Sequence, residues 1–207
     1  MISLNEYLAD PCGTLSIPYW KAASITIPEN LSIYHQSQLP ADLSAYRSVD
    51  PYFRLYHDLN SVSDSFPSSL SMTTAKEKDV DTIVSIINRS YHDIQVTSAQ
   101  ISGYRRTPVF APELWVLAWN EHGGCIGCGI ADLDPDSGEL ILEWIQVLPE
   151  FRRQGIGRAI VNQLLFRGRT AAQFATVSGR QDDPSCPEAL YRSCGFTGSD
   201  LWYICRK

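Results

Sequence analysis

The stretch from residue 140 to residue 165 constrains the fold most, because its pattern changes from that of a strand to that of a helix across a short basic loop. From Leu140 to Leu148, apolar and mixed side chains alternate with a period of two, and the β-branched and aromatic residues among them favour a strand. Pro149 has no amide hydrogen, so the hydrogen-bond ladder of the strand ends near it. After Gly155, apolar residues recur at i and i+4, which predicts an amphipathic helix that Gly168 ends in a left-handed conformation.

The loop between this strand and this helix, residues 152–158, reads Arg-Arg-Gln-Gly-Ile-Gly-Arg. The first amides of a helix have no carbonyl partner, glycines let the backbone approach a ligand closely, and the helix dipole adds partial positive charge. The loop therefore predicts an anion site for a diphosphate, to which Arg152, Arg153 and Arg158 add full charges. It lacks the lysine-serine ending of a nucleotide P-loop and the Gly-x-Gly-x-x-Gly spacing of dinucleotide folds.

Two motifs of the chain resemble motifs of the GCN5-related N-acetyltransferase (GNAT) family. The loop matches the Gln/Arg-x-x-Gly-x-Gly/Ala motif, with Arg152, Gly155 and Gly157 at the defined positions and Val-Leu-Pro-Glu-Phe directly before them. Further on, residues 190–196 match the Leu-Tyr-x-x-x-Gly-Phe segment that is common in the family. The two motifs occur in the family's order, and the resemblance covers about residues 68–207.

The order of the expected elements also resembles the GNAT fold, which implies an α/β (α+β) architecture. Its central sheet would be mixed but mostly antiparallel, splayed between the fourth and fifth strands and flanked by helices. The expected elements are a strand at 70–73, a helix from a capping box at 74–77 to about 90, a helix at 98–104, strands at 114–119, 125–132 and 140–148, the helix after 155, a strand at 174–178, a helix from a capping box at 185–188 that Gly195 ends, and a closing hairpin from 196–197 and 201–204. Because a helix crosses between them, the strand at 174–178 should run parallel to the strand at 140–148.

Residues 1–67 fall outside the resemblance and are expected to be an N-terminal extension of the acetyltransferase domain, which would span 68–207. The dense aromatic residues of this segment oppose a disordered tail, while its prolines prevent long elements. We therefore expect short strands or turns packed on the main domain. Two interpretations stay open: the extension is a wall of the acceptor pocket, or it serves packing alone.

The resemblance implies acetyl-CoA as the co-substrate. In GNAT enzymes the pantetheine arm lies between the splayed strands like an added strand, which assigns it to the backbone of Ile145, Gln146 and Val147. The diphosphate is assigned to the whole loop: Arg152, Arg153, Gln154, Gly155, Ile156, Gly157 and Arg158. One departure puts a second cofactor contact in doubt, since many members have an asparagine several residues before the motif tyrosine, whereas residues 181–185 read Gln-Asp-Asp-Pro-Ser.

Two residues are candidates for acid–base catalysis. Tyr191 matches the family's usual general acid, a phenol near the sulfur of the departing CoA; the alternative is an aromatic residue that packs at the start of a helix. Glu143 is the candidate base, acting directly or through water, because it lies on the central strand where family members often carry a carboxylate. The alternative is a solvated or ion-paired strand residue, and a bulge in the strand would change the face that Glu143 occupies.

Composition limits the partners. The net charge of −6 and the pI near 5.2 disfavour a nucleic-acid binder, which needs a basic face, and suit a cationic or amine substrate. The chain has no run of about 18 apolar residues and its N-terminus lacks the features of a signal peptide, so we expect a cytoplasmic protein without a membrane partner. Cys125 and Cys128 have no matching Cys or His pair, so we expect reduced thiols and no metal site.

Together these features predict an N-acetyltransferase that moves an acetyl group from acetyl-CoA to a primary amine of a small molecule or peptide, by direct attack in a ternary complex. Two alternatives stay open: a non-catalytic acyl-CoA-binding or sensing module, and a nucleotide-binding regulatory domain. No motif specifies the acceptor, whose determinants we expect in residues 1–65 and around His92, itself expected to be a solvated turn residue. A homodimer stays open as well.

Overall fold

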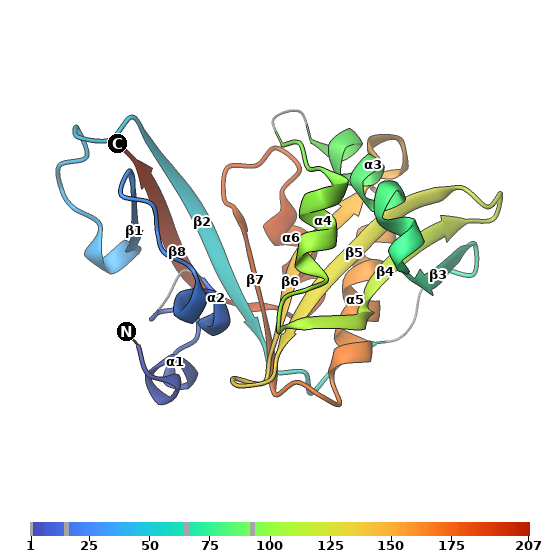
Figure 1. Ribbon diagram of the computed structural model, residues 1–207, viewed down its shortest axis with the longest axis horizontal. Helices are drawn as coiled ribbons and strands as arrows, with labels where there is room; N and C mark the ends of the chain where they lie inside the picture. Colours follow the sequence, from blue (N-terminus) through green and yellow to red (C-terminus); the bar gives the residue numbers. More distant parts are fainter. Residues whose placement is uncertain (1, 15–16, 64–66, 92–93) are drawn as a thin grey trace.

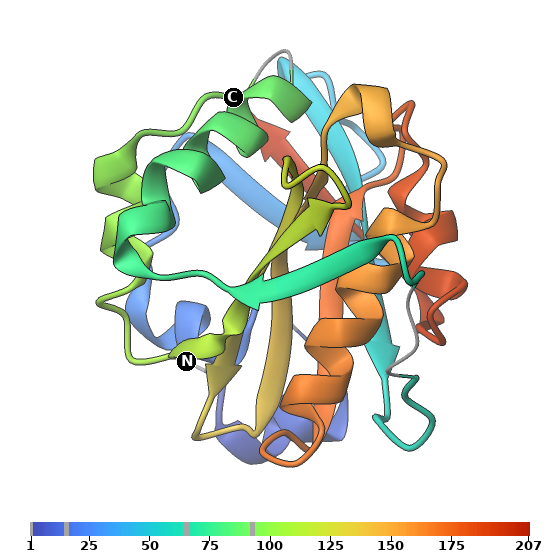
Figure 2. The ribbon, with the colours of Figure 1, turned by 90° about the vertical axis from the view of Figure 1, so that its right-hand side faces the viewer.

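The described residues of the computed structural model, 2–14, 17–63, 67–91 and 94–207, form a sheet of eight strands with helices on both faces (Figures 1 and 2). The strands are β1 Leu31–His35, β2 Ser48–His57, β3 Leu70–Thr74, β4 Phe110–Asn120, β5 Cys125–Asp134, β6 Glu139–Val147, β7 Phe174–Arg180 and β8 Thr197–Arg206. Their order across the sheet is β1-β8-β2-β7-β6-β5-β4-β3. All neighbours are antiparallel except β6 and β7, which confirms the expected mixed, mostly antiparallel architecture and the parallel pair at its centre.

Helices cover the two faces of the sheet. They are α1 Leu4–Ala9, α2 Tyr19–Ser24, α3 Val80–Ser90, α4 Ser98–Tyr104, α5 Ile156–Gly168 and α6 Pro187–Arg192, with short 3-10 turns η1 Gln36–Gln38, η2 Glu77–Asp79 and η3 Pro149–Phe151. Helix α5 packs on β4, β5 and β6 from one face, while α3 and α4 lie on the other face (Figure 2). In the described ranges, no helix is both long enough and apolar enough to cross a membrane.

Alternation along the strands builds two hydrophobic cores. On β4, Leu114 and Val116 point toward α5, whereas Trp115 and Leu117 point toward α3 and α4, and all four are buried. The side-chain period of two along a strand places successive residues on opposite faces. Both faces of this part of the sheet are therefore closed by helices.

The N-terminal segment contributes a strand to the interior of the sheet. β2 lies between β7 and β8 and pairs antiparallel with both of them. The expected closing hairpin at 196–204 is therefore wrong: β8 is one continuous strand, and its inner partner comes from residues 48–57 at the other end of the chain. The sheet runs across the boundary that we expected after residue 67, and Figure 1 shows β2 and β8 side by side.

A buried polar network fixes this arrangement. The Arg54 guanidinium of β2 lies 3.0 Å from the Glu139 carboxylate of β6, and the two side chains are 2% and 0% exposed. Tyr7 of α1 donates to Glu139 at 2.6 Å and accepts from Arg54 at 2.8 Å, and Thr176 of β7 donates to the same carboxylate. The network therefore joins α1, β2, β6 and β7.

The two central strands separate partway along their length. β6 and β7 pair from Glu139↔Phe174 to Leu142↔Val177 and no further. On the other side of β6, the register with β5 shifts between Ile130 and Ala131, whose partners are Trp144 and Leu142, so Glu143 sits in a bulge. The expected splay begins after Leu142 and Val177, and we call this opening between β6 and β7 the fork.

Some expected helix ends are wrong. The capping box expected at 74–77 is absent: α3 begins only at Val80, after the η2 turn. α5 ends at Gly168 as expected, but this glycine is not in the expected left-handed conformation. An added Cβ there would meet Leu140 Cδ2 at 2.7 Å, so the glycine permits close packing of helix on strand. Ser185 does not cap α6, because Cys186 takes the cap position in a left-handed conformation. By contrast, α4 occupies the expected residues and has a Thr97–Gln100 capping box.

Candidate active site

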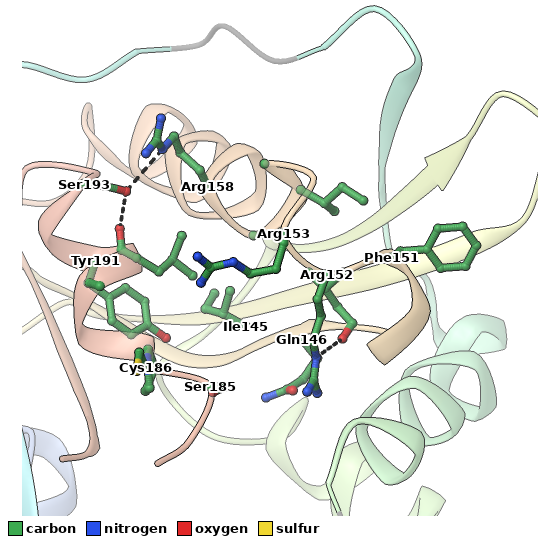
Figure 3. A pocket seen from close by; sticks show the side chains of 17 residues that line it. Ile145, Gln146, Phe151, Arg152, Arg153, Arg158, Ser185, Cys186, Tyr191 and Ser193 are labelled. Carbon is green, nitrogen blue, oxygen red and sulfur yellow. Dashed lines mark hydrogen bonds between the residues drawn. The ribbon is translucent and has the colours of Figure 1, made fainter. Parts of the chain in front are cut away.

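A cavity of about 550 Å³ opens between the fork, the N-terminus of α5 and helix α6 (Figure 3). It contains Tyr191 and every residue expected to bind the cofactor except Gln154. Its lining residues are Ile145, Gln146, Val147, Phe151, Arg152, Arg153, Gly155, Ile156, Gly157, Arg158, Ser185, Cys186, Pro187, Ala189, Leu190, Tyr191 and Ser193. Glu143 lies outside this cavity.

The N-terminus of α5 supplies open backbone amides. Gly155 precedes the helix in a left-handed conformation, φ 80°, and the first helical hydrogen bond runs from the Ala159 amide to the Gly155 carbonyl. The amides of the first turn, Ile156 to Arg158, therefore have no helical acceptor. An added Cβ at Gly157 would lie 3.1 Å from Leu190 Cδ2, so a side chain there would narrow the space between α5 and α6.

The three arginines of the loop have different tasks. Arg152 donates to the Val147 carbonyl at 3.1 Å and to the Ser90 carbonyl at 2.7 Å, and so holds the loop against the end of α3. Arg158 donates to Ser193 Oγ at 3.2 Å and joins α5 to the end of α6. Arg153 forms no hydrogen bond or ion pair with another described residue, and Figure 3 shows its side chain reaching into the cavity. This arginine is the loop cation that is available to an anion.

Arg153 also has a left-handed backbone, φ 64°, which is uncommon for a residue with a Cβ. Such a conformation costs on the order of 1 kcal/mol and persists only where the surrounding structure holds it. Here it turns the side chain into the cavity just before Gly155 starts the helix. Strained backbone beside a helix N-terminus is a further sign of a ligand site.

Beyond the fork, one edge of β6 faces the cavity. Ile145, Gln146 and Val147 line it and have no β7 partner, so this edge is open for a ligand that pairs like a strand. The Gln146 side chain points elsewhere, donating to Tyr91 Oη at 2.8 Å. The Val147 carbonyl already accepts from Arg152, as described above, so the open edge is partly occupied by the protein.

Tyr191 projects into the cavity from α6 (Figure 3). Its ring packs against Phe53 and Phe196, with centroids 6.0 and 5.9 Å away, and the residue is 8% exposed. Burial, with a smaller contribution from the nearby Tyr91, raises the pKa of the Tyr191 phenol, so the hydroxyl keeps its proton at neutral pH. No other described side chain forms a hydrogen bond with this hydroxyl, which leaves it available to a ligand.

Glu143 lies at the start of the fork and lines a second cavity, of about 200 Å³. Its carboxylate forms an ion pair with Lys21 of α2. Asp132 on the neighbouring strand β5 is 6% exposed. Burial first, and the charge of Glu143 second, raise the pKa of Asp132 to about 7, while Lys21 opposes this shift. Sequence reasoning singled out Glu143 but neither of its two charged neighbours.

Other cavity residues were missed for a simple reason. Ser185, Cys186 and Leu190 belong to the turn before α6 or to α6 itself, and only their neighbour Tyr191 matched a motif. The signal that could have found these residues is their proximity to Tyr191 in the sequence. His92 lies outside the described residues. Within the described part of the chain, no group of three or more His, Cys, Asp or Glu side chains is placed to hold a metal ion.

Comparison with known families agrees with this geometry. Residues 111–198, which contain the fork, the glycine loop and Tyr191, match the family model described as the acetyltransferase (GNAT) domain. This part of the chain is therefore similar to the acetyltransferase (GNAT) domain. No curated protein sequence matches the chain.

Solved structures share the GNAT fold at low sequence identity. A GCN5-related N-acetyltransferase from Sphaerobacter thermophilus has a TM-score of 0.67 at 18% identity over 78% of this chain, which spans only 52% of that protein. The ribosomal-protein-S18-alanine N-acetyltransferase from Escherichia coli has a TM-score of 0.54 at 16% identity, covering 66% of this chain and 92% of its own. A functionally unknown protein from Staphylococcus epidermidis matches 100% of this chain and 81% of its own, at 12% identity and a TM-score of 0.64, so the fold likeness extends to the N-terminal segment.

Proposed function

We propose that the protein transfers an acetyl group from acetyl-CoA to a primary amine of a small molecule or peptide, by direct attack in a ternary complex. One observation carries the proposal: a single cavity joins the open edge of β6, the open amides of α5 and the Tyr191 phenol. A strand edge suits an amide-bearing arm, a helix N-terminus suits a diphosphate, and a protonated phenol suits a departing thiolate.

The cavity fits acetyl-CoA on grounds of its own chemistry. The amides of Ile156, Gly157 and Arg158 would hold the diphosphate, with the free Arg153 guanidinium beside them. Gly157 keeps this space open, because a side chain there would run into Leu190. The open β6 edge would hold the pantetheine arm. When bound, acetyl-CoA supplies an activated acyl carbon and a thiolate leaving group.

The chain's own residues then have two proton tasks. Tyr191, kept protonated by burial, would donate its proton toward the leaving sulfur. Glu143 would accept a proton from the amine at the fork, which requires Lys21 to leave the carboxylate. The acidic pair Glu143 and Asp132 and the net charge of −6 favour a cationic acceptor.

A second candidate function rests on the Lys21–Glu143 ion pair. If Lys21 stayed on the carboxylate permanently, the base would be unavailable, and the protein would bind an acyl-CoA without turning it over. Such a sensing module would keep the whole cofactor cavity and lack acetyl transfer to any added amine. The two functions therefore differ in turnover and agree in CoA binding.

The direct test is an acetylation screen that reports free CoA over amines, amino acids, polyamines, aminoglycosides and peptides. With an active acceptor, Tyr191→Phe should lower kcat by roughly 10²–10⁴-fold, the usual contribution of a general acid, and leave CoA binding nearly unchanged. Tyr104→Phe, which removes an exposed hydroxyl on α4, is the matched control. Unchanged turnover in Tyr191→Phe would return this tyrosine to a packing role. If none of the tested amines causes the release of free CoA, the sensing module is favoured.

A further inference from the structure

A lysine of the N-terminal segment lies on the carboxylate that we propose as the base. Lys21 on α2 forms an ion pair with Glu143 on β6, 122 residues further along the chain. The two side chains are 22% and 23% exposed, so the pair is accessible and not locked in the core. An amine of the chain itself therefore occupies the position from which an acceptor would give its proton to Glu143.

This ion pair lines the second cavity, which begins at the fork. Glu143 and Ser178 directly follow the last paired residues of β6 and β7, Leu142 and Val177, and both line the cavity. The N-terminal segment, β1, β2 and β8 complete its walls. Residues of the N-terminal segment therefore form part of the wall of the cavity at the fork.

The second cavity lies beside the cofactor cavity, because residues that line the one contact or neighbour residues that line the other. Phe53 lines the second cavity, and its ring packs on that of Tyr191, which lines the first. Ile145, only two positions after Glu143 on β6, also lines the first. Lys21 therefore lies in the second cavity, on the side of the cofactor cavity where the proposed acid Tyr191 contacts Phe53.

One carboxylate contacts the Lys21 ammonium, and a second carboxyl group interacts with it electrostatically. Glu143 forms the ion pair, and Asp132 on β5 interacts electrostatically with both Glu143 and Lys21. Two acidic groups beside one amine provide acceptors for the proton that a lysine must lose before it becomes a nucleophile.

We propose that Lys21 is an internal acceptor, a site at which the protein acetylates itself in cis; this inference rests on the proposed function. Glu143 takes one proton from the Lys21 ammonium, and the neutral Nζ attacks the thioester carbon. A nitrogen–carbon bond forms and the carbon–sulfur bond breaks. The second proton of the attacking nitrogen is released as the thiolate takes one from Tyr191, which solvent then reprotonates. Overall, the ammonium and acetyl-CoA give acetyl-lysine, the CoA thiol and one proton, and the ion pair on Glu143 is lost.

The other lysines of the chain serve as internal controls for non-specific acetylation. They are Lys76, Lys78 and Lys207, and all three are exposed. Uncatalysed acetylation by acetyl-CoA would favour these accessible amines over the partly buried and ion-paired Lys21. Selective modification of Lys21 is therefore the signature of a positioned reaction.

The test incubates the full chain with acetyl-CoA and no added amine, and follows each lysine by peptide mass spectrometry. Lys21 should gain one acetyl group at least about tenfold faster than any other lysine, since the reaction is intramolecular. The rate per molecule should not change on dilution. Lys21→Arg should remove the selective signal, whereas Lys78→Arg, the matched control, should keep it.

Acetylation that is equal at all lysines, confined to the exposed ones, or proportional to protein concentration would overturn the inference. A second measurement needs no acetyl-CoA: in ¹³C-methylated protein, the Lys21 resonance should move in Glu143→Gln while those of Lys76 and Lys207 stay. An unmoved Lys21 resonance would contradict the ion pair. If added amines are acetylated while Lys21 stays unmodified, the inference fails and the proposed function stands. If acetyl-CoA does not bind, both fail.

Discussion

The cofactor cavity differs in construction from the region where α1 and β2 pack against β6 and β7, which we call the N-terminal face. The cavity comes from β6, the glycine loop, α5 and α6, elements that lie within residues 139–192. The N-terminal face depends on contacts such as Arg54–Glu139 and Tyr7–Glu139, which join residues 85 and 132 positions apart. A site made of one contiguous stretch leaves a motif in the sequence, whereas a face made of distant segments leaves none.

Substitutions in the buried network of the N-terminal face test the difference between the two regions most strongly. Arg54→Met should lower the free energy of unfolding by roughly 3–5 kcal/mol, because it leaves the Glu139 carboxylate buried without its cation. Tyr7→Phe, which removes one hydrogen bond to the same carboxylate, should cost only about 1 kcal/mol. Urea unfolding measures both.

A loss below about 1 kcal/mol in Arg54→Met would show that the N-terminal face is not held by this ion pair. The folded fraction of Arg54→Met should in addition retain its response to acetyl-CoA, since Arg54 does not line the cofactor cavity. A variant that stays folded but loses this response would join the two regions that we treat as separate.

The same contrast explains what the sequence predicted. The period of two on β4, β5 and β6 and the i, i+4 pattern of α5 are local, and the expected strands and helices lie where these patterns placed them. The position of β2 is not local. Val49 and Phe53 read as part of a proline-rich segment, and only pairing with β7 and β8 makes them the inner strand of the sheet.

Within the site, the sequence predicted which residues lie there better than it predicted which partner each side chain binds. The loop sequence indicated three arginines, yet Arg152 and Arg158 form hydrogen bonds within the protein and, of the three, Arg153 is the one available to an anion. These tasks depend on carbonyl and hydroxyl acceptors at Ser90 and Ser193, which no pattern around the loop encodes. The partner of Glu143 was equally hidden, since Lys21 reaches it across the fold.

A smaller effect concerns pH at the fork. Burial raises the pKa of Asp132 to about 7, so the folded protein keeps a proton there from about pH 4 to 7, where the unfolded chain has lost it. Stability should therefore fall as the pH rises through this window and level off above it. Asp132→Asn carries no such proton, so relative to the wild type it should gain ~1–2 kcal/mol between pH 5 and pH 8.

Urea unfolding at pH 5 and pH 8 checks this expectation. Asp136→Asn, which neutralises an exposed carboxylate in the turn between β5 and β6, is the matched control and should follow the wild type. Parallel pH profiles for Asp132→Asn and the wild type would mean that Asp132 is ionised in the fold at neutral pH.

The central claim is that the glycine loop and the fork form an acetyl-CoA site, and thermal unfolding with and without acetyl-CoA tests it most directly. Acetyl-CoA should raise the Tm of the wild type, and ATP should not. Gly157→Trp should lose nearly all of the acetyl-CoA shift by filling the space between α5 and α6, while Gly103→Trp, at a glycine whose added Cβ meets nothing within 4 Å, should keep it. An acetyl-CoA shift that is unchanged in Gly157→Trp, or absent from the wild type, would contradict the account.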